Sequence, residues 1–327
     1  MAMYMKLSLL ILFVAIVYYF TRSFFGGCVC TSKVSLEGRT VVITGANAGI
    51  GRETALDLAM RGARVIMACR NLQKAQTTAK EIAEKSHNSN IVVKHLDLAS
   101  LKSVRDFAED MNKNEVRLDV LINNAGVACL PELTKTQDNF EMAMGVNHLG
   151  HFLLTNLLLD LLIKSAPSRI VVVTSAAHKY ATKGLNLENI NSELFYDRYE
   201  PYIQSKLANI LFSKELARHL KGSGVTVNSL HPGVIIAESE IKRHFPPVLQ
   251  TVFSILLTPI VKTAKQGAQT TIYLAVSEDV EGVSGLYFQD CAITEPSEPA
   301  QDENMARKLW DVSQTLVGLN TTIQTVK

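Results

Sequence analysis

The chain has 327 residues, 47% of them hydrophobic, and a formal net charge of +2. This length and apolar content suit one large globular domain with an ample core. The near-neutral charge, without any polybasic stretch, argues against a nucleic-acid partner. The cysteines are odd in number and scattered, and no pair has zinc-ligand spacing beside partner histidines. We therefore expect no disulfide framework and no metal site, but inert thiols in a reducing compartment.

The chain begins with an uncharged apolar run, Leu7 to Phe20. The run is shorter than the roughly 18–20 residues of a comfortable membrane span and matches a signal-peptide core in length. Bulky aromatic residues stand where a small-residue cleavage site would be, so we expect a retained anchor within residues 1–32. More basic residues follow the run than precede it, which favours a cytosolic position for the single domain over residues 33–327. A buried N-terminal helix is the alternative.

The stretch RTVVITGANAGIGRETALDLAMRGARVIMACRN predicts a strand–helix–strand unit. Thr40 to Thr44 is a β-branched, apolar run typical of a buried strand. A helix is predicted from Arg52 to Arg61, and Gly62 ends it before the strand ARVIMA.

This alternation continues along the chain. The segments NIVVKHLDL and LDVLINNAG predict strands, with a helix from about Leu101 to Met111 between them. The segments SRIVVVTSA and GVTVNSLHPG predict two more strands, each after a helix-like segment. The pattern indicates an α/β fold with a doubly wound, Rossmann-type parallel sheet.

Residues 234–265 break this rhythm. Within them, Val248 to Val261 is strongly apolar, follows two prolines and precedes Lys262 and Lys265. The run is too short to span a bilayer. A core helix is possible, but a substrate lid or a membrane-facing helix fits better because the sheet already has helices for its core.

A glycine-rich turn joins the first strand to its helix. Gly45, Gly49 and Gly51 would let the backbone approach a pyrophosphate at the positive end of the helix dipole. Their Gly-x-x-x-Gly-x-Gly spacing departs from the Gly-x-Gly-x-x-Gly fingerprint of the usual dinucleotide fold.

Four motifs in register, TGANAGIG, NNAG, TSAAH and YIQSK, resemble the short-chain dehydrogenase/reductase family from about residue 36 to about residue 315. The finer pattern looks like the microsomal retinol dehydrogenase branch. The resemblance implies an enzyme of the endoplasmic reticulum membrane that interconverts a small hydrophobic alcohol, most of all retinol, with its aldehyde, reduction being favoured. Steroids or lipid aldehydes are alternative substrates, a non-catalytic scaffold is a further alternative, and a homo-oligomer is left open.

The motif YIQSK places a phenol and an ammonium one helical turn apart. An ammonium near Tyr202 would lower the pKa of the phenol from about 10, which suits proton transfer at neutral pH. By resemblance, Lys206 also holds the nicotinamide ribose, and Ser175 polarises the substrate carbonyl. Asn147 would help to hold a water in a proton relay, and Ser175 and Tyr202 would contact the substrate.

The second strand ends in Cys69–Arg70, where NAD-preferring enzymes place an acid that binds the ribose hydroxyls. Arg70, with Arg52 after the glycine turn, suits the 2′-phosphate of NADP(H) instead. The cofactor-binding residues implied by the resemblance are Gly45, Asn47, Gly49, Ile50, Gly51, Arg52, Arg70, Asp97, Leu98, Asn123, Asn124, Ala125, Gly126, Tyr202, Lys206, Pro232 and Gly233.

Other polar features carry less weight. His148, His151 and His178 flank the catalytic positions without metal spacing, and we interpret them as pocket or helix-surface residues. Asn320 begins a glycosylation sequon that a cytosolic domain would leave unused. After Gly233 the segment VIIAE delays the hydroxyl residue that the family brings to the nicotinamide amide, which puts that contact in doubt.

Overall fold

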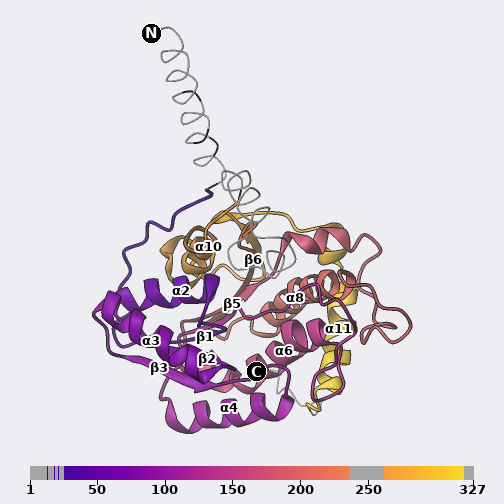
Figure 1. The fold of residues 1–327 in the computed structure, drawn as a ribbon, viewed down its shortest axis with the longest axis horizontal. Helices are drawn as coiled ribbons and strands as arrows, with labels where there is room; N and C mark the ends of the chain where they lie inside the picture. The colour runs from indigo at the N-terminus through magenta and orange to yellow at the C-terminus, as the bar shows by residue number, and fades with distance from the viewer. Residues whose placement is uncertain (1–12, 14–17, 19–20, 22–25, 236–260, 320–327) are drawn as a thin grey trace, which may run out of the picture.

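The computed structural model describes residues 13, 18, 21, 26–235 and 261–319 (Figure 1). The strands are β1 (Thr40–Thr44), β2 (Arg64–Cys69), β3 (Ile91–His95), β4 (Val120–Asn123), β5 (Ser168–Val173), β6 (Val225–His231), β7 (Tyr287–Gln289) and β8 (Ala292–Ile293). The α-helices are α2 (Gly49–Met60), α3 (Leu72–Ser86), α4 (Leu101–Asn114), α5 (Met142–Met144), α6 (Gly150–Leu157), α7 (Leu159–Lys164), α8 (Glu200–His219), α10 (Ala264–Val276) and α11 (Glu303–Leu316). A π-helical turn, η1 (Gly145–Leu149), and three 3₁₀ helices, η2 (Ala176–Tyr180), η4 (Glu278–Val280) and η5 (Glu298–Gln301), complete the described elements.

The described strands form one eight-stranded sheet in the order β3-β2-β1-β4-β5-β6-β7-β8. Every pairing is parallel except that of β7 with β8. The predicted strands are therefore confirmed as a doubly wound parallel sheet. Two differences are local: α2 begins at Gly49 and not at Arg52, and β7 and β8 are too short to give a periodic signal.

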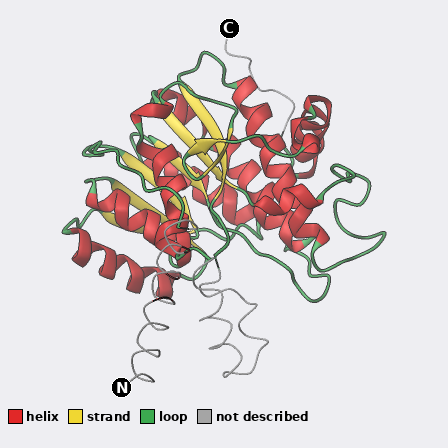
Figure 2. Ribbon diagram, turned by 90° about the horizontal axis from the view of Figure 1, so that it is seen from above, coloured by secondary structure: helices red, strands yellow, loops and turns green. Residues whose placement is uncertain are grey.

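Helices cover both faces of the sheet (Figures 1 and 2). On one face, α2, α3 and α10 pack on side chains such as Val41 and Ile43. On the other, α4, α6, α8 and α11 pack on side chains such as Val42. Successive residues of a strand point to opposite faces, so a run of consecutive apolar residues is needed to fill both cores.

The strand order reverses beside β1. The chain runs outward through β2 and β3, then returns to place β4 on the other side of β1. The loops after β1 and β4 consequently diverge and leave a crevice at the carboxyl ends of these strands, where ligands of such sheets bind.

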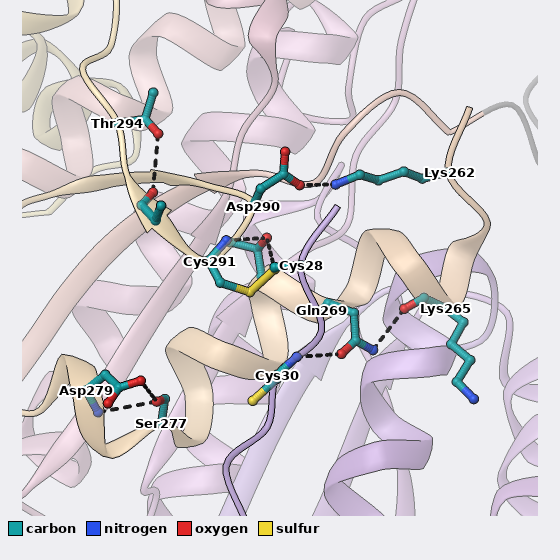
Figure 3. The surroundings of a disulfide bond; sticks show 12 residues. Cys28, Cys30, Lys262, Lys265, Gln269, Ser277, Asp279, Asp290, Cys291 and Thr294 are labelled. Atoms are coloured by element: carbon teal, nitrogen blue, oxygen red, sulfur yellow. Dashed lines mark hydrogen bonds and ion pairs between the residues drawn. A yellow bond between two sulfur atoms is a disulfide. The ribbon is translucent and has the colours of Figure 1, made fainter. Parts of the chain in front are cut away.

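The structure corrects the prediction about cysteines. A disulfide joins Cys28 to Cys291, with 5.9 Å between their Cα atoms (Figure 3). Cys291 lies in the tight turn between β7 and β8, and the segment around Cys28 runs along α10, where the Cys30 amide donates to Gln269. The sequence separation of 263 positions explains the error, because only the folded sheet brings the two cysteines together.

Two predicted segments fall mainly outside the described residues. They are the apolar run of the anchor and the stretch 236–260 within the proposed lid segment. In the part of the chain that the structure describes, no helix combines the length and apolarity needed to cross a bilayer.

Candidate active site

The glycine turn after β1 packs closely against the end of β4. Gly45 has a φ of +68°, which favours glycine, and a Cβ on it would lie 3.1 Å from Ala125. A Cβ on Gly51 would lie 2.5 Å from the Gly45 carbonyl oxygen and 2.7 Å from Asn124 Nδ2. The Thr44 hydroxyl oxygen accepts hydrogen bonds from the amides of Asn124 and Ala125, both at 2.9 Å. The two motifs therefore form one backbone cradle that side chains would fill.

A cleft of about 490 Å³ lies at the carboxyl ends of β1, β2, β3 and β4. Its described lining includes most of the residues predicted to bind the cofactor: Gly45, Asn47, Gly49, Ile50, Gly51, Arg70, Asp97, Leu98, Asn124, Ala125 and Gly126. It also includes residues that were not predicted, among them Ala48, Asn71, Leu96, Val127 and Val146. Except for Val146, which lies in η1, they come within a few residues after a strand end, and that position is the signal that could have found them.

Two predicted cofactor residues, Arg52 and Asn123, are not among the described residues that line the cleft, and their contact with a cofactor stays a prediction. The Arg52 guanidinium donates to Glu53 at 2.7 Å and Glu81 at 2.9 Å. The hydrogen bond to Glu81 and the charges of both carboxylates raise the pKa of Arg52, so its guanidinium stays charged and paired with them. Asn123 ends β4 and is buried, and its side-chain amide donates to Thr155 at 2.8 Å. Asn124, one residue later, occupies the cleft in its place.

At the end of β2, Cys69 and Arg70 lie in very different environments. Cys69 is buried, and the backbone amides of Ala46 and Asn47 donate to its sulfur. Burial raises the pKa of this thiol to about 11, so it stays neutral. Arg70 is exposed in the lining of the cleft, and within the described residues no acidic side chain pairs with it. Among the described residues of the lining, the end of β2 thus presents the cation Arg70, whereas the acidic side chain, Asp97, comes from the segment after β3.

Tyr202 and Lys206 lie on α8, as predicted, with Lys206 Nζ 5.6 Å from the centre of the Tyr202 ring. The buried ammonium donates to the Val173 carbonyl of β5 at 3.2 Å, and burial lowers its pKa to about 8. The expected decrease in the phenol pKa is not found. Burial raises the pKa of Tyr202, and a hydrogen bond with the Ser175 hydroxyl opposes that rise only in part.

Ser175 and Asn147 reach the same place from other elements. The Ser175 hydroxyl caps η2 by accepting from the Ala177 amide at 3.1 Å. Asn147 lies in η1, where its side chain accepts from the Val127 amide and donates to Ser205. A Cβ on Gly126 would lie 3.2 Å from Asn147 Oδ1 and 3.5 Å from Lys206 Nζ, so these groups meet at the end of the cleft.

The histidines are buried and not on the helix surface. His148 bonds to Ser313 of α11, and His151 bridges the Thr44 hydroxyl and the Asn147 carbonyl. Burial lowers the pKa of both to about 4. They are neutral internal connections, and His151 links the glycine turn to Asn147.

Pro232 and Gly233 follow β6 but are not among the described residues lining the cleft. The side chain of Lys262 covers Gly233 and pairs with Asp290, and the Lys262 amide donates to the Val234 carbonyl. These contacts hold Val234 and Lys262, described residues on either side of the segment 236–260. The contact of the segment after Gly233 with a cofactor stays a prediction.

Comparisons with known proteins agree with this geometry. A family model described as short chain dehydrogenase matches residues 39–244. The mouse protein named retinol dehydrogenase 14 is 52% identical over 294 residues, which cover 87% of each chain. A crystal structure of an uncharacterized protein from Mycobacterium paratuberculosis has a TM-score of 0.72 and 36% identity, covering 91% of this chain and 100% of that one. The Pseudomonas aeruginosa RhlG/NADP active-site complex has a TM-score of 0.62 and 26% identity, covering 78% and 95%.

Proposed function

The chain belongs to the short-chain dehydrogenase family, and from that premise we propose that it is an NADP(H)-dependent retinol dehydrogenase that favours the reduction of retinal-type aldehydes. It is an oxidoreductase that binds a nicotinamide cofactor. The observation that carries the proposal is the convergence of Tyr202, Ser175, Lys206 and Asn147 at the end of the cleft.

The residues of the cleft fit such a cofactor. The cradle of Gly45, Gly51 and Asn124 leaves backbone without side chains where a pyrophosphate would lie, at the amino end of α2. Asp97, Ala125 and their neighbours would line the adenosine and ribose parts. When bound, the nicotinamide supplies the hydride for reduction or accepts it in oxidation.

Tyr202 is the proposed proton donor. Burial raises its pKa, so its phenol keeps its proton at neutral pH, the form that can protonate a carbonyl oxygen. Reduction adds a hydride to the carbonyl carbon and this proton to its oxygen. Ser175, hydrogen-bonded to Tyr202, would hold and polarise that oxygen. Lys206 would hold the ribose, and Asn147 would support the relay that returns a proton to Tyr202.

The preference for NADP(H) rests on the end of β2. Cys69 stands where an acid would bind both ribose hydroxyls, and the Arg70 guanidinium, which no acidic side chain of the described residues pairs with, would bind a 2′-phosphate. The similar RhlG structure from Pseudomonas aeruginosa is a complex with NADP, which supports the same choice. The engagement of Arg52 with two glutamates leaves Arg70 as the proposed phosphate ligand.

The substrate class rests on the named relatives. The mouse relative is named for retinol, and 52% identity over most of both chains supports a retinoid here. A panel of retinal, a steroid ketone and a medium-chain aldehyde, with NADPH and NADH and full-length protein in detergent, tests the proposal. We expect the highest kcat/KM with retinal and NADPH. A steroid or lipid aldehyde as best substrate would replace the retinoid, and no turnover at all would favour the scaffold.

We also propose attachment to the endoplasmic reticulum membrane through the apolar run of residues 7–20. Deleting residues 1–25, which spares Cys28, should move the protein from the membrane pellet to the soluble fraction. The basic residues after the run favour a cytosolic domain, whereas the Cys28–Cys291 disulfide favours an oxidising compartment. A glycan at Asn320 in cells would place the domain in the lumen and exclude the cytosolic orientation.

A further inference from the structure

His178 holds the carbonyl group of Ser175. Its Nδ1 lies 2.7 Å from the Ser175 carbonyl oxygen, and its Nε2 lies 3.1 Å from the Ser297 amide nitrogen. A carbonyl only accepts and an amide only donates, so Nδ1 carries the proton and Nε2 is the acceptor. The ring is fully buried and meets the Tyr287 ring edge-on at 5.2 Å. Both ring nitrogens are therefore used, and the orientation of the ring is determined.

His231 holds the next amide. It is the last residue of β6, is buried, and its Nδ1 accepts a hydrogen bond from the Ala176 amide at 3.1 Å. This histidine must therefore have an unprotonated Nδ1, the opposite arrangement to that of His178.

Both histidines are neutral at physiological pH, so these bonds persist there. Burial lowers the pKa of His178, and the Lys179 charge adds to that effect. Burial lowers the pKa of His231 to about 4, with Lys262 and Lys179 in the same direction and Asp290 opposing them.

The Ser175 carbonyl and the Ala176 N–H belong to one planar peptide group. We propose that His178 and His231 are positioning residues. By hydrogen-bonding to the carbonyl and the amide of this one peptide group, they fix its orientation and so direct the Ser175 hydroxyl toward Tyr202. The inference rests on the function proposed above. A planar group held at both its donor and its acceptor cannot rotate about the Ser175 Cα–C bond without breaking a buried hydrogen bond. With the plane fixed, the Ala177 amide selects the position of the hydroxyl.

Matched substitutions separate this hydrogen bonding to the peptide group from a role in packing alone. His178→Asn keeps a donor where Nδ1 stood, whereas His178→Gln keeps only the outer acceptor for Ser297. His231→Asn keeps an acceptor where Nδ1 stood, whereas His231→Leu has similar volume and no acceptor. We expect His178→Gln and His231→Leu to lower kcat for the best aldehyde by about 10- to 100-fold, since small misplacements of reacting groups have effects of that size. Each Asn variant should stay within about threefold of wild type, and NADPH affinity should change little in all four.

A second measurement does not depend on the reaction. Hydrogen exchange of the peptide covering residues 174–180 reports whether the Ala176 amide is protected. Exchange should accelerate in His231→Leu and remain slow in His231→Asn. Equal kcat losses in the two members of a pair, or unchanged exchange in His231→Leu, would contradict the proposed positioning role of the histidines. If wild type reduces no substrate on the panel while exchange behaves as expected, the proposed function is wrong, but the histidines still fix the orientation of the peptide group.

Discussion

At Tyr202, burial and hydrogen bonding act in opposite directions on the phenol. Burial is the larger effect and raises its pKa, and the hydrogen bond with Ser175 lowers it. Lys206 lies over the face of the ring and donates to the Val173 carbonyl. The residue pair is therefore arranged to keep a proton on Tyr202 and a cation beside it, as the proposed reduction requires.

Replacing Tyr202 by Phe removes the proposed proton donor and leaves the ring in place. We expect kcat for the best aldehyde to fall by about 10²–10⁴, the usual contribution of a general acid, with the dissociation constant of NADPH unchanged. Steady-state kinetics and a binding titration on the same preparation check this. Near-normal turnover in Tyr202→Phe would show that the proton comes from another group.

The two arginines near the cleft should behave differently. Arg70→Asp should lower the ratio of kcat/KM for NADPH to that for NADH by at least about tenfold, because a charge-assisted hydrogen bond to a phosphate contributes about 1.5–3 kcal/mol. Arg52→Gln is the matched control, since its guanidinium already serves Glu53 and Glu81. An equal effect of both substitutions, or a wild type that prefers NADH, would contradict this assignment.

At the scale of elements, the first turn of α2 packs so closely on the turn after β1 that Gly51 has no room for a side chain. A Cβ on Gly51 would meet the Gly45 carbonyl and Asn124 Nδ2, which themselves form the cradle. Gly51→Ala should therefore weaken NADPH binding by about tenfold or more, because Gly45 and Asn124 must move. Gly282→Ala is the control, as it has a positive φ but open space around it and lies outside the cleft lining. Equal NADPH affinity in the two variants would show that the cradle tolerates the shift.

Helix α11 packs against α8. Trp310 of α11 packs at ring-centre distances of 4.9 Å from Phe152 and 4.5 Å from His219, and its ring is also stacked with Phe212. These aromatic contacts attach the last described helix to the one that carries Tyr202 and Lys206. Because Trp310 is the single tryptophan of the chain, its fluorescence reports this docking directly.

For the whole molecule, the buried histidines predict acid sensitivity. His148, His151 and His231 have pKa values of about 4 in the fold against 6.5 in the unfolded chain. The fold binds fewer protons, so its stability is full above pH 6.5 and falls as the pH drops toward 4, by up to about 1.4 kcal/mol per pH unit for each histidine. Urea unfolding from pH 7 to pH 5 measures this slope, and His148→Gln should reduce it. A flat profile would contradict neutral burial.

The disulfide is the other feature of the whole molecule that can be tested. Cys28→Ser should lower the free energy of unfolding by about 2–5 kcal/mol, because the bond closes a very long loop. Cys291→Ser and the double variant should lose the same amount, since all three lack one bond. Cys30→Ser, at a free cysteine nearby, is the control. Equal stability of wild type with and without a thiol reductant would show that the bond contributes nothing.

Local pattern determined the framework of this protein. Consecutive apolar residues from Thr40 to Thr44 predict a strand buried on both faces, and that strand is found with the same bounds. The glycine spacing and the YIQSK motif likewise located the turn and the helix that carry the site. These features are readable because they depend on residues within a few positions of each other, where backbone geometry and side-chain periodicity dominate.

Only the tertiary structure decided which of these residues face the site and in which state. Arg52 and Arg70 look alike in the sequence. In the structure, Arg52 forms ion pairs with two glutamates, whereas no glutamate among the described residues pairs with Arg70. The neutral state of His231 and its hold on Ala176, like the Cys28–Cys291 bond, arise between strands or loops far apart in the chain. Charge, pKa and hydrogen-bond partner depend on neighbours in space, and those neighbours exist only once the sheet and its helices have assembled.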